Sequence, residues 1–122
     1  MSTVLDFDKA VSVNLVLRRG DYYERTFLVK KNGEDYDWDG IEDVILQVKK
    51  DKRNSTIVFE LKKSEDTIVT GLGYMTWILD TNATDIPAGL YESLEFLLVY
   101  ENDKPKLWFD GNTTVKDRGI KL

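Results

Sequence analysis

Apolar residues recur at every second position in the segment 90–100, and this alternation constrains the fold more than any other feature of the chain. The alternating residues are Leu94, Phe96, Leu98 and Tyr100. A spacing of two places side chains on one face of a β-strand. Leu97 and Val99 are apolar as well, so we expect a central strand that is covered on both faces. Residues 101–104 are polar turn residues, and 107–109 begin the next strand of a hairpin.

Similar strand patterns recur about every ten residues, with turn signals between them. Apolar alternation or enrichment in β-formers is found in 11–18, 22–31, 44–49, 57–61 and 74–80. The turn signals are Arg19-Gly20-Asp21, Asn32-Gly33 and Asp39-Gly40. Short strands at this spacing predict a sandwich or barrel. Residues 81–86 predict at most one helical turn, with Thr81 or Asn82 as its N-cap.

Composition narrows the classes of function. The chain has 122 residues, a net charge of −5, no cysteine and no histidine. Thiolate chemistry and the usual general base near neutral pH are therefore missing, which disfavours a hydrolase. The acidic balance argues against nucleic-acid binding, because phosphate contacts rely on basic patches. No apolar run approaches the roughly 20 residues that span a bilayer, so we expect no membrane insertion.

The length predicts a single domain. We place an N-terminal tail at residues 1–10 and one β domain at residues 11–122. The tail has acidic residues and no long apolar region, so we do not expect it to act as a signal peptide.

An acidic motif occupies the loop before the strand at 44–49. It reads Asp35-Tyr36-Asp37-Trp38-Asp39-Gly40 and matches the first half of a calcium-binding loop. The second half departs from the pattern, because Leu46 stands where a bidentate glutamate is needed. A polar loop joining two strands is the simpler interpretation. Weak calcium binding by Asp35, Asp37 and Asp39 is the alternative.

Aromatic residues suggest two further roles. Gly89-Leu90-Tyr91 resembles a tyrosine corner, in which a tyrosine hydroxyl at a strand start bonds back to a nearby backbone group. Large rings elsewhere serve either the core or an interface. The interface candidates are Tyr22, Tyr23, Tyr36 and Trp38.

Three groups of residues give the chain a resemblance to a known family. They are Leu15-Val16-Leu17-Arg18-Arg19-Gly20-Asp21, then Asn32-Gly33 with Trp38-Asp39-Gly40, and then Ile86-Pro87-Ala88-Gly89-Leu90-Tyr91 with Trp108-Phe109-Asp110-Gly111. In this order and spacing they resemble the immunoglobulin-like N-terminal domain of phage upper-baseplate proteins (the BppU type) and related small tail and virion proteins. The similarity covers residues 11–118. Domains of that type are normally followed by further domains, so a chain of 122 residues is expected to be a stand-alone virion protein or a module with another attachment.

The resemblance implies both a fold and a function. The fold is all-β, an antiparallel immunoglobulin-like β-sandwich of about seven to nine strands. The function is that of a non-enzymatic structural component of a bacteriophage particle, in the tail, the baseplate or associated with the capsid. Its partners would be other virion proteins and copies of itself, with no cofactor, and it would occupy the host cytoplasm before assembly into the virion. The alternative is a carbohydrate- or cell-surface-binding β-sandwich module that uses Trp38 and Tyr36, assisted by calcium.

Overall fold

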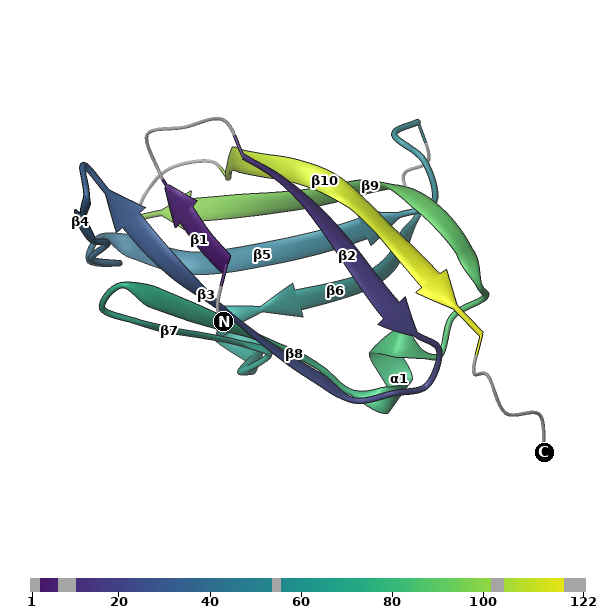
Figure 1. Ribbon diagram of the computed structural model, residues 1–122. Coiled ribbons are helices and arrows are strands. Elements are labelled where there is room, and N and C mark those ends of the chain that lie inside the picture. Colours follow the sequence, from purple (N-terminus) through teal and green to yellow (C-terminus); the bar gives the residue numbers. More distant parts are fainter. Residues whose placement is uncertain (1–2, 7–10, 54–55, 102–104, 118–122) are drawn as a thin grey trace.

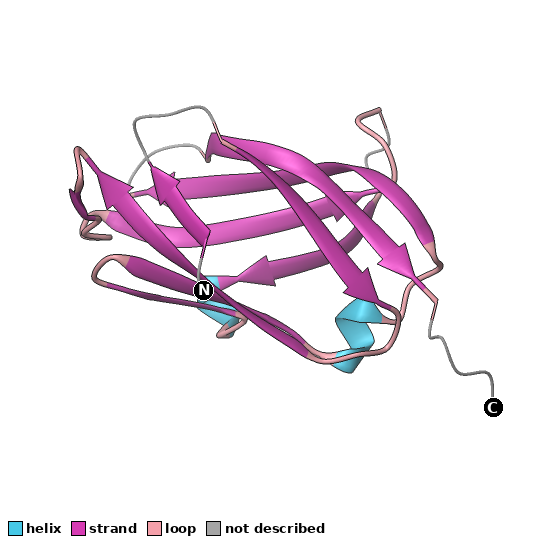
Figure 2. Cartoon of the chain, in the orientation of Figure 1, coloured by secondary structure: helices cyan, strands magenta, loops and turns pink. Residues whose placement is uncertain are grey.

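The protein is built almost entirely of β-strands (Figure 1; Figure 2). The computed structural model describes residues 3–6, 11–53, 56–101 and 105–117. The strands are β1 (Thr3–Asp6), β2 (Ser12–Arg18), β3 (Tyr23–Lys31), β4 (Glu34–Asp35), β5 (Ile41–Lys49), β6 (Ile57–Lys62), β7 (Ile68–Gly71), β8 (Tyr74–Leu79), β9 (Gly89–Tyr100) and β10 (Lys106–Lys116). The helices are α1 (Thr81–Thr84) and a 3-10 turn at Lys63–Glu65. Within the described ranges, neither is long and apolar enough to cross a membrane.

The strands form two sheets that pack face to face. One sheet has the order β1-β3-β8-β7, with β4 added to β3, and the other has the order β2-β10-β9-β5-β6 (Figure 1). The predicted all-β, immunoglobulin-like sandwich is confirmed. The strand count exceeds the expected seven to nine because β1 and the two-residue β4 have too few residues to show a pattern.

Two strand pairs differ from the antiparallel arrangement predicted for the whole domain. β1 pairs with β3 in parallel, and β2 pairs with β10 in parallel. β1 also lies inside the segment 1–10 that we expected to be a tail. Its Leu5 is only 2% exposed and lies opposite Val29 of β3. Four residues are too few to carry a readable periodicity, so only the pairing with β3 reveals this strand.

Stacked aromatic rings join the two sheets. Trp77 of β8 and Phe96 of β9 are fully buried, and their ring centroids are 5.9 Å apart with planes at 20°. Phe96 in turn stacks on Phe109 of β10 at 4.7 Å and 7°. Phe27 of β3 packs against Trp77 at 4.4 Å. Because these rings come from both sheets, their burial and stacking hold the layers together.

β9 is central in its sheet, as predicted, between β10 and β5. Its inward residues Leu94, Phe96 and Leu98 are buried. The prediction that both faces are covered is wrong. Leu97 lies on the outer face, in register with Leu107, which is 53% exposed. A two-layer sandwich gives each strand only one partner face, so the outer apolar residues are shielded only by neighbours in their own sheet.

The predicted turns and the tyrosine corner are confirmed. Asn32 and Gly33 have φ of 54° and 77° between β3 and β4, and the φ of Gly40 before β5 is 83°, values that favour asparagine and glycine. The hydroxyl of Tyr91 donates to the carbonyl oxygen of Pro87 at 2.6 Å. The turn predicted at 101–104 and the end of the predicted domain at 118–122 fall largely outside the described residues.

The predicted helical turn is present as α1, but its N-cap is different. Asp80 caps it, with its Oδ1 accepting the N–H of Ala83 at 2.8 Å. Thr81 and Asn82 are the first helical residues instead. A carboxylate one residue earlier in the chain makes the same kind of bond to an N-terminal amide.

Candidate interaction surfaces

The outer face of the β1-β3-β8-β7 sheet carries an exposed apolar row. Val4, Leu28 and Tyr74 are register partners on β1, β3 and β8. Their exposed fractions are 55%, 39% and 39%. The ring of Tyr74 lies directly over Gly71 of β7, where a Cβ would come within 2.3 Å of it. The row therefore crosses all four strands without interruption.

Further exposed apolar residues continue this surface. Val69 of β7 lies opposite Thr76, next to the row, and Leu72 occupies the β7–β8 turn with 68% of its surface exposed. The hydroxyls of Thr26 and Thr76 bond to each other at 2.9 Å across the same face. We call Val4, Leu28, Val69, Leu72 and Tyr74 the apolar face. Contiguous exposed apolar surface of this kind is typical of an interaction site.

The structure places Tyr22 and Tyr23 together at the start of β3, on opposite faces. Tyr22 is 55% exposed, and its hydroxyl donates to Glu24 Oε1 at 2.8 Å. That hydrogen bond raises the pKa of Tyr22. The Tyr23 hydroxyl accepts the N–H of Arg18 at 2.8 Å and so ties the end of β2 to β3. Tyr22 is thus exposed and available for contact with another protein, whereas Tyr23 stabilises the packing of β2 against β3.

Tyr36 and Trp38 do not lie on an exposed surface. They are 9% and 8% exposed, and their rings meet edge-to-face at 4.9 Å. Trp38 Nε1 donates to the carbonyl oxygen of Tyr74 at 3.1 Å. Burial raises the pKa of Tyr36 to about 12, with a smaller contribution from Tyr100. The sequence did not decide whether these rings belong to the core or to an interface. In the structure, the β4–β5 connection packs both rings onto the core. They are therefore not exposed as interface anchors, nor as the carbohydrate-binding residues of the alternative function.

Two of the three aspartates proposed as calcium ligands have other partners. The Asp35 carboxylate pairs with Lys30, and Asp37 Oδ1 accepts the N–H of Asp39 at 3.0 Å. This second bond closes a local turn, which is the ordinary use of aspartate in a loop. Across the described ranges, no three acidic side chains lie close enough together to hold a metal ion.

Comparison with solved structures relates this chain to a phage domain. No protein-family model and no curated protein matches this chain. Among solved structures, the N-terminal domain of phage TP901-1 ORF48 matches 93% of this chain and 94% of its own, with a TM-score of 0.55 and 14% identity. This chain has the fold of that phage domain. Domains 3–5 of the extracellular part of Drosophila OTK match with a TM-score of 0.35 and 14% identity, over 87% of this chain and 33% of that one.

Sequence reasoning missed most of the apolar face of this phage-type fold. Phe27, Leu28 and Val29 are consecutive apolar residues, and only a two-layer arrangement decides that Leu28 points outward. Val4 lies in the segment expected to be a tail. The signal available was the apolar run itself, because a half-buried strand normally alternates with polar residues.

Proposed function

We propose that this protein is a non-enzymatic structural component of a bacteriophage particle that acts through protein–protein contacts. The observation that carries the proposal is the fold match to the N-terminal domain of ORF48 of phage TP901-1. The match covers more than nine-tenths of both chains, so it relates whole domains and not a shared fragment. Its partners are other virion proteins and further copies of the chain.

The apolar face supplies a contact surface for assembly. It presents Leu28 and Tyr74 at the centre of a sheet, flanked by Val4 and Leu72. Aromatic and aliphatic side chains in such a position are the usual anchors of interfaces. In a particle that contains many copies, modest pairwise contacts add up through avidity.

Mass spectrometry of purified particles tests the proposal directly. Particles produced by the phage or prophage that carries the gene are expected to contain this protein in a fixed number of copies. Detection in the lysate but not in purified particles would contradict the proposal.

A pair of substitutions tests the role of the apolar face. Leu28→Glu places a charge at its centre, and we expect incorporation into particles to fall by about tenfold or more, since an unpaired charge in an interface is costly. Leu107→Glu is the matched control, because Leu107 is also exposed but lies on the outer face of the other sheet. Equal incorporation of both variants would show that the apolar face is not the assembly surface.

A further inference from the structure

Within the described ranges, no strand pairs with one edge of the first half of β3. β8 pairs with Tyr23 to Leu28 on one edge, whereas on the other edge β1 pairs only with Phe27 to Lys30. The N–H of Val29 donates to the carbonyl oxygen of Gly73 at 2.8 Å. The odd-numbered residues of β3 therefore direct their backbone N–H and C=O groups toward β8. Successive residues of a strand face opposite edges. Glu24 and Thr26 therefore direct their N–H and C=O groups to the edge where none of the described strands pairs with residues 23–26.

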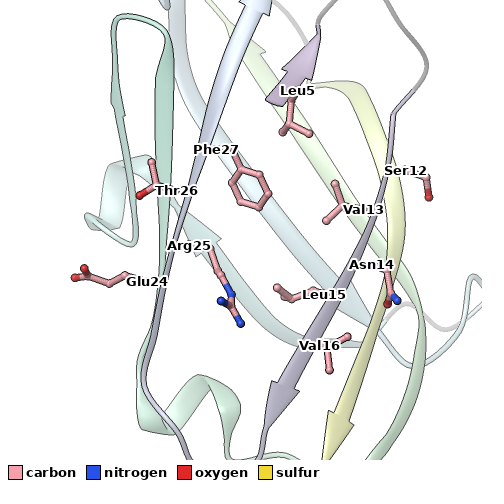
Figure 3. A pocket seen from close by; sticks show the side chains of 10 residues that line it. All are labelled: Leu5, Ser12, Val13, Asn14, Leu15, Val16, Glu24, Arg25, Thr26 and Phe27. Atoms are coloured by element: carbon pink, nitrogen blue, oxygen red, sulfur yellow. The ribbon is translucent and has the colours of Figure 1, made fainter. Parts of the chain in front are cut away.

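This edge opens on a groove between the two sheets. The groove has a volume of about 590 Å³ and is lined by β1, β2 and the first half of β3. Leu5, Leu15 and Phe27 form its apolar floor and are 2%, 4% and 7% exposed. Figure 3 shows these side chains gathered between β3 and β2, while Glu24 and Thr26 point away. β2 is the last strand of its own sheet, so the groove separates two strand edges.

Arg25 supplies a positive charge inside the groove. Its side chain extends from β3 toward β2 (Figure 3), and its guanidinium lies over the ring of Tyr23 at 4.9 Å. Among the described residues Arg25 has no carboxylate partner, although the chain carries a net charge of −5. A planar guanidinium is suited to a carboxylate, which it binds through two parallel hydrogen bonds.

We propose that the groove binds an extended segment of a different protein, which adds as a strand to the free edge of β3. The segment pairs with the backbone of Glu24 and Thr26, its inward apolar side chains contact Leu15 and Phe27, and one inward carboxylate binds Arg25. Strand addition of this kind draws affinity from the backbone and specificity from alternate side chains. The inference deepens the proposed function, since it rests on the protein working through protein–protein contacts.

The carboxylate comes from another protein because the edge strands that the structure describes do not offer a suitable one. The edge strands β2 and β7 contain no acidic residue, and β4, which consists of Glu34 and Asp35, is only two residues long. Glu60 on the edge strand β6 is already bonded to Gln47 at 2.7 Å and to Lys62 at 3.2 Å. Asp6 on β1 also has an interaction within the chain.

The test uses two synthetic peptides and a reversal of charge. Both peptides alternate valine with threonine, and the central inward residue is glutamate in one and lysine in the other. For the wild-type chain, fluorescence polarisation is expected to show about tenfold tighter binding of the glutamate peptide. Arg25→Glu should reverse this preference. Arg53→Glu, which makes the same change of charge in the β5–β6 connection, should leave it unaltered.

Two-dimensional NMR locates the bound strand independently of affinity. The amides of Glu24 and Thr26 are expected to become protected from hydrogen exchange in the complex, and Thr26→Pro should abolish binding. Because Thr26→Pro risks misfolding, the amide protection is read on the wild-type chain. Protection on β2 instead, an unchanged preference in Arg25→Glu, or no binding of either peptide would overturn the proposal.

Three further outcomes identify the source of the segment and test the proposed function separately from the groove inference. Self-association of the chain that Arg25→Glu abolishes in native mass spectrometry would assign the groove to a second copy and overturn the proposal. Incorporation of Arg25→Glu into particles at the wild-type level would overturn the groove inference and leave the phage structural role intact. Peptide binding as described, by a protein absent from particles, would overturn that role and leave the groove inference standing.

Discussion

Replacing Gly111 with alanine tests how closely β2 and β10 are packed. Gly111 lies opposite Val13 in the parallel pair that closes one side of the groove. A Cβ on Gly111 would stand 1.8 Å from the carbonyl oxygen of Val13 and 2.9 Å from its nitrogen. These atoms are backbone, so the contact cannot be relieved by rotating a side chain.

The size of the effect follows from the distance. The optimal separation of non-bonded heavy atoms begins at about 3.5 Å, so β2 must move by about 1.7 Å. A displacement of this size takes the adjacent ladder bonds beyond the hydrogen-bonding range, and we expect about two of them to break. Each broken bond costs about 1 kcal/mol, more where a buried group is left unpaired, which gives a loss of about 2–4 kcal/mol. For a domain of this size that corresponds to a fall in Tm of about 8–16 °C.

Thermal and urea unfolding followed by circular dichroism measure the loss. Gly40→Ala is the matched control, because no atom lies within 4 Å of its Cβ position and its φ is +83°. The control therefore carries only the conformational penalty of about 1–2 kcal/mol. Gly111 has no positive φ, so its penalty is steric alone. A Tm for Gly111→Ala within about 3 °C of the wild type would refute the reasoning.

Four other predictions can be checked on the same material. Tyr91→Phe removes the 2.6 Å bond to the Pro87 carbonyl and should cost about 1–2 kcal/mol in urea unfolding; no measurable cost would contradict this. Burial raises the pKa of Tyr36 to about 12, so the stability that its neutral form contributes is complete below about pH 10 and is lost as the pH rises toward 12. Tyr36→Phe should show a smaller alkaline fall in stability, and an identical pH profile would refute this. Asp80→Ala removes the N-cap bond of α1 and should cost about 1 kcal/mol, restored by asparagine at that position. Because Asp35 pairs with Lys30 and Asp37 accepts a backbone N–H, EDTA should leave the Tm unchanged, and a rise in Tm with calcium would restore the calcium interpretation.

Local sequence chemistry determined the strands and most turns. Leu94, Phe96 and Leu98 alternate strictly, and all three face the core. Asn32-Gly33 forms a turn because both residues tolerate positive φ. Tyr91 forms its corner with a residue only four positions away. In each case the residues that decide the structure are neighbours in the chain, so the pattern can be read without a fold.

Contacts between segments far apart in the chain decided which side chains and strand edges are exposed. Leu28 points outward and Phe27 inward only because the second sheet covers one face of β3. Tyr36 and Trp38 are buried because the β4–β5 connection brings Trp38 to the backbone of Tyr74, 36 residues away. The groove beside Arg25 exists because β1 pairs with only part of β3. The sequence by itself determined which segments are strands, since hydrophobic periodicity is local; tertiary structure alone decided which faces and edges stay uncovered, since that depends on the packing of residues far apart in the chain.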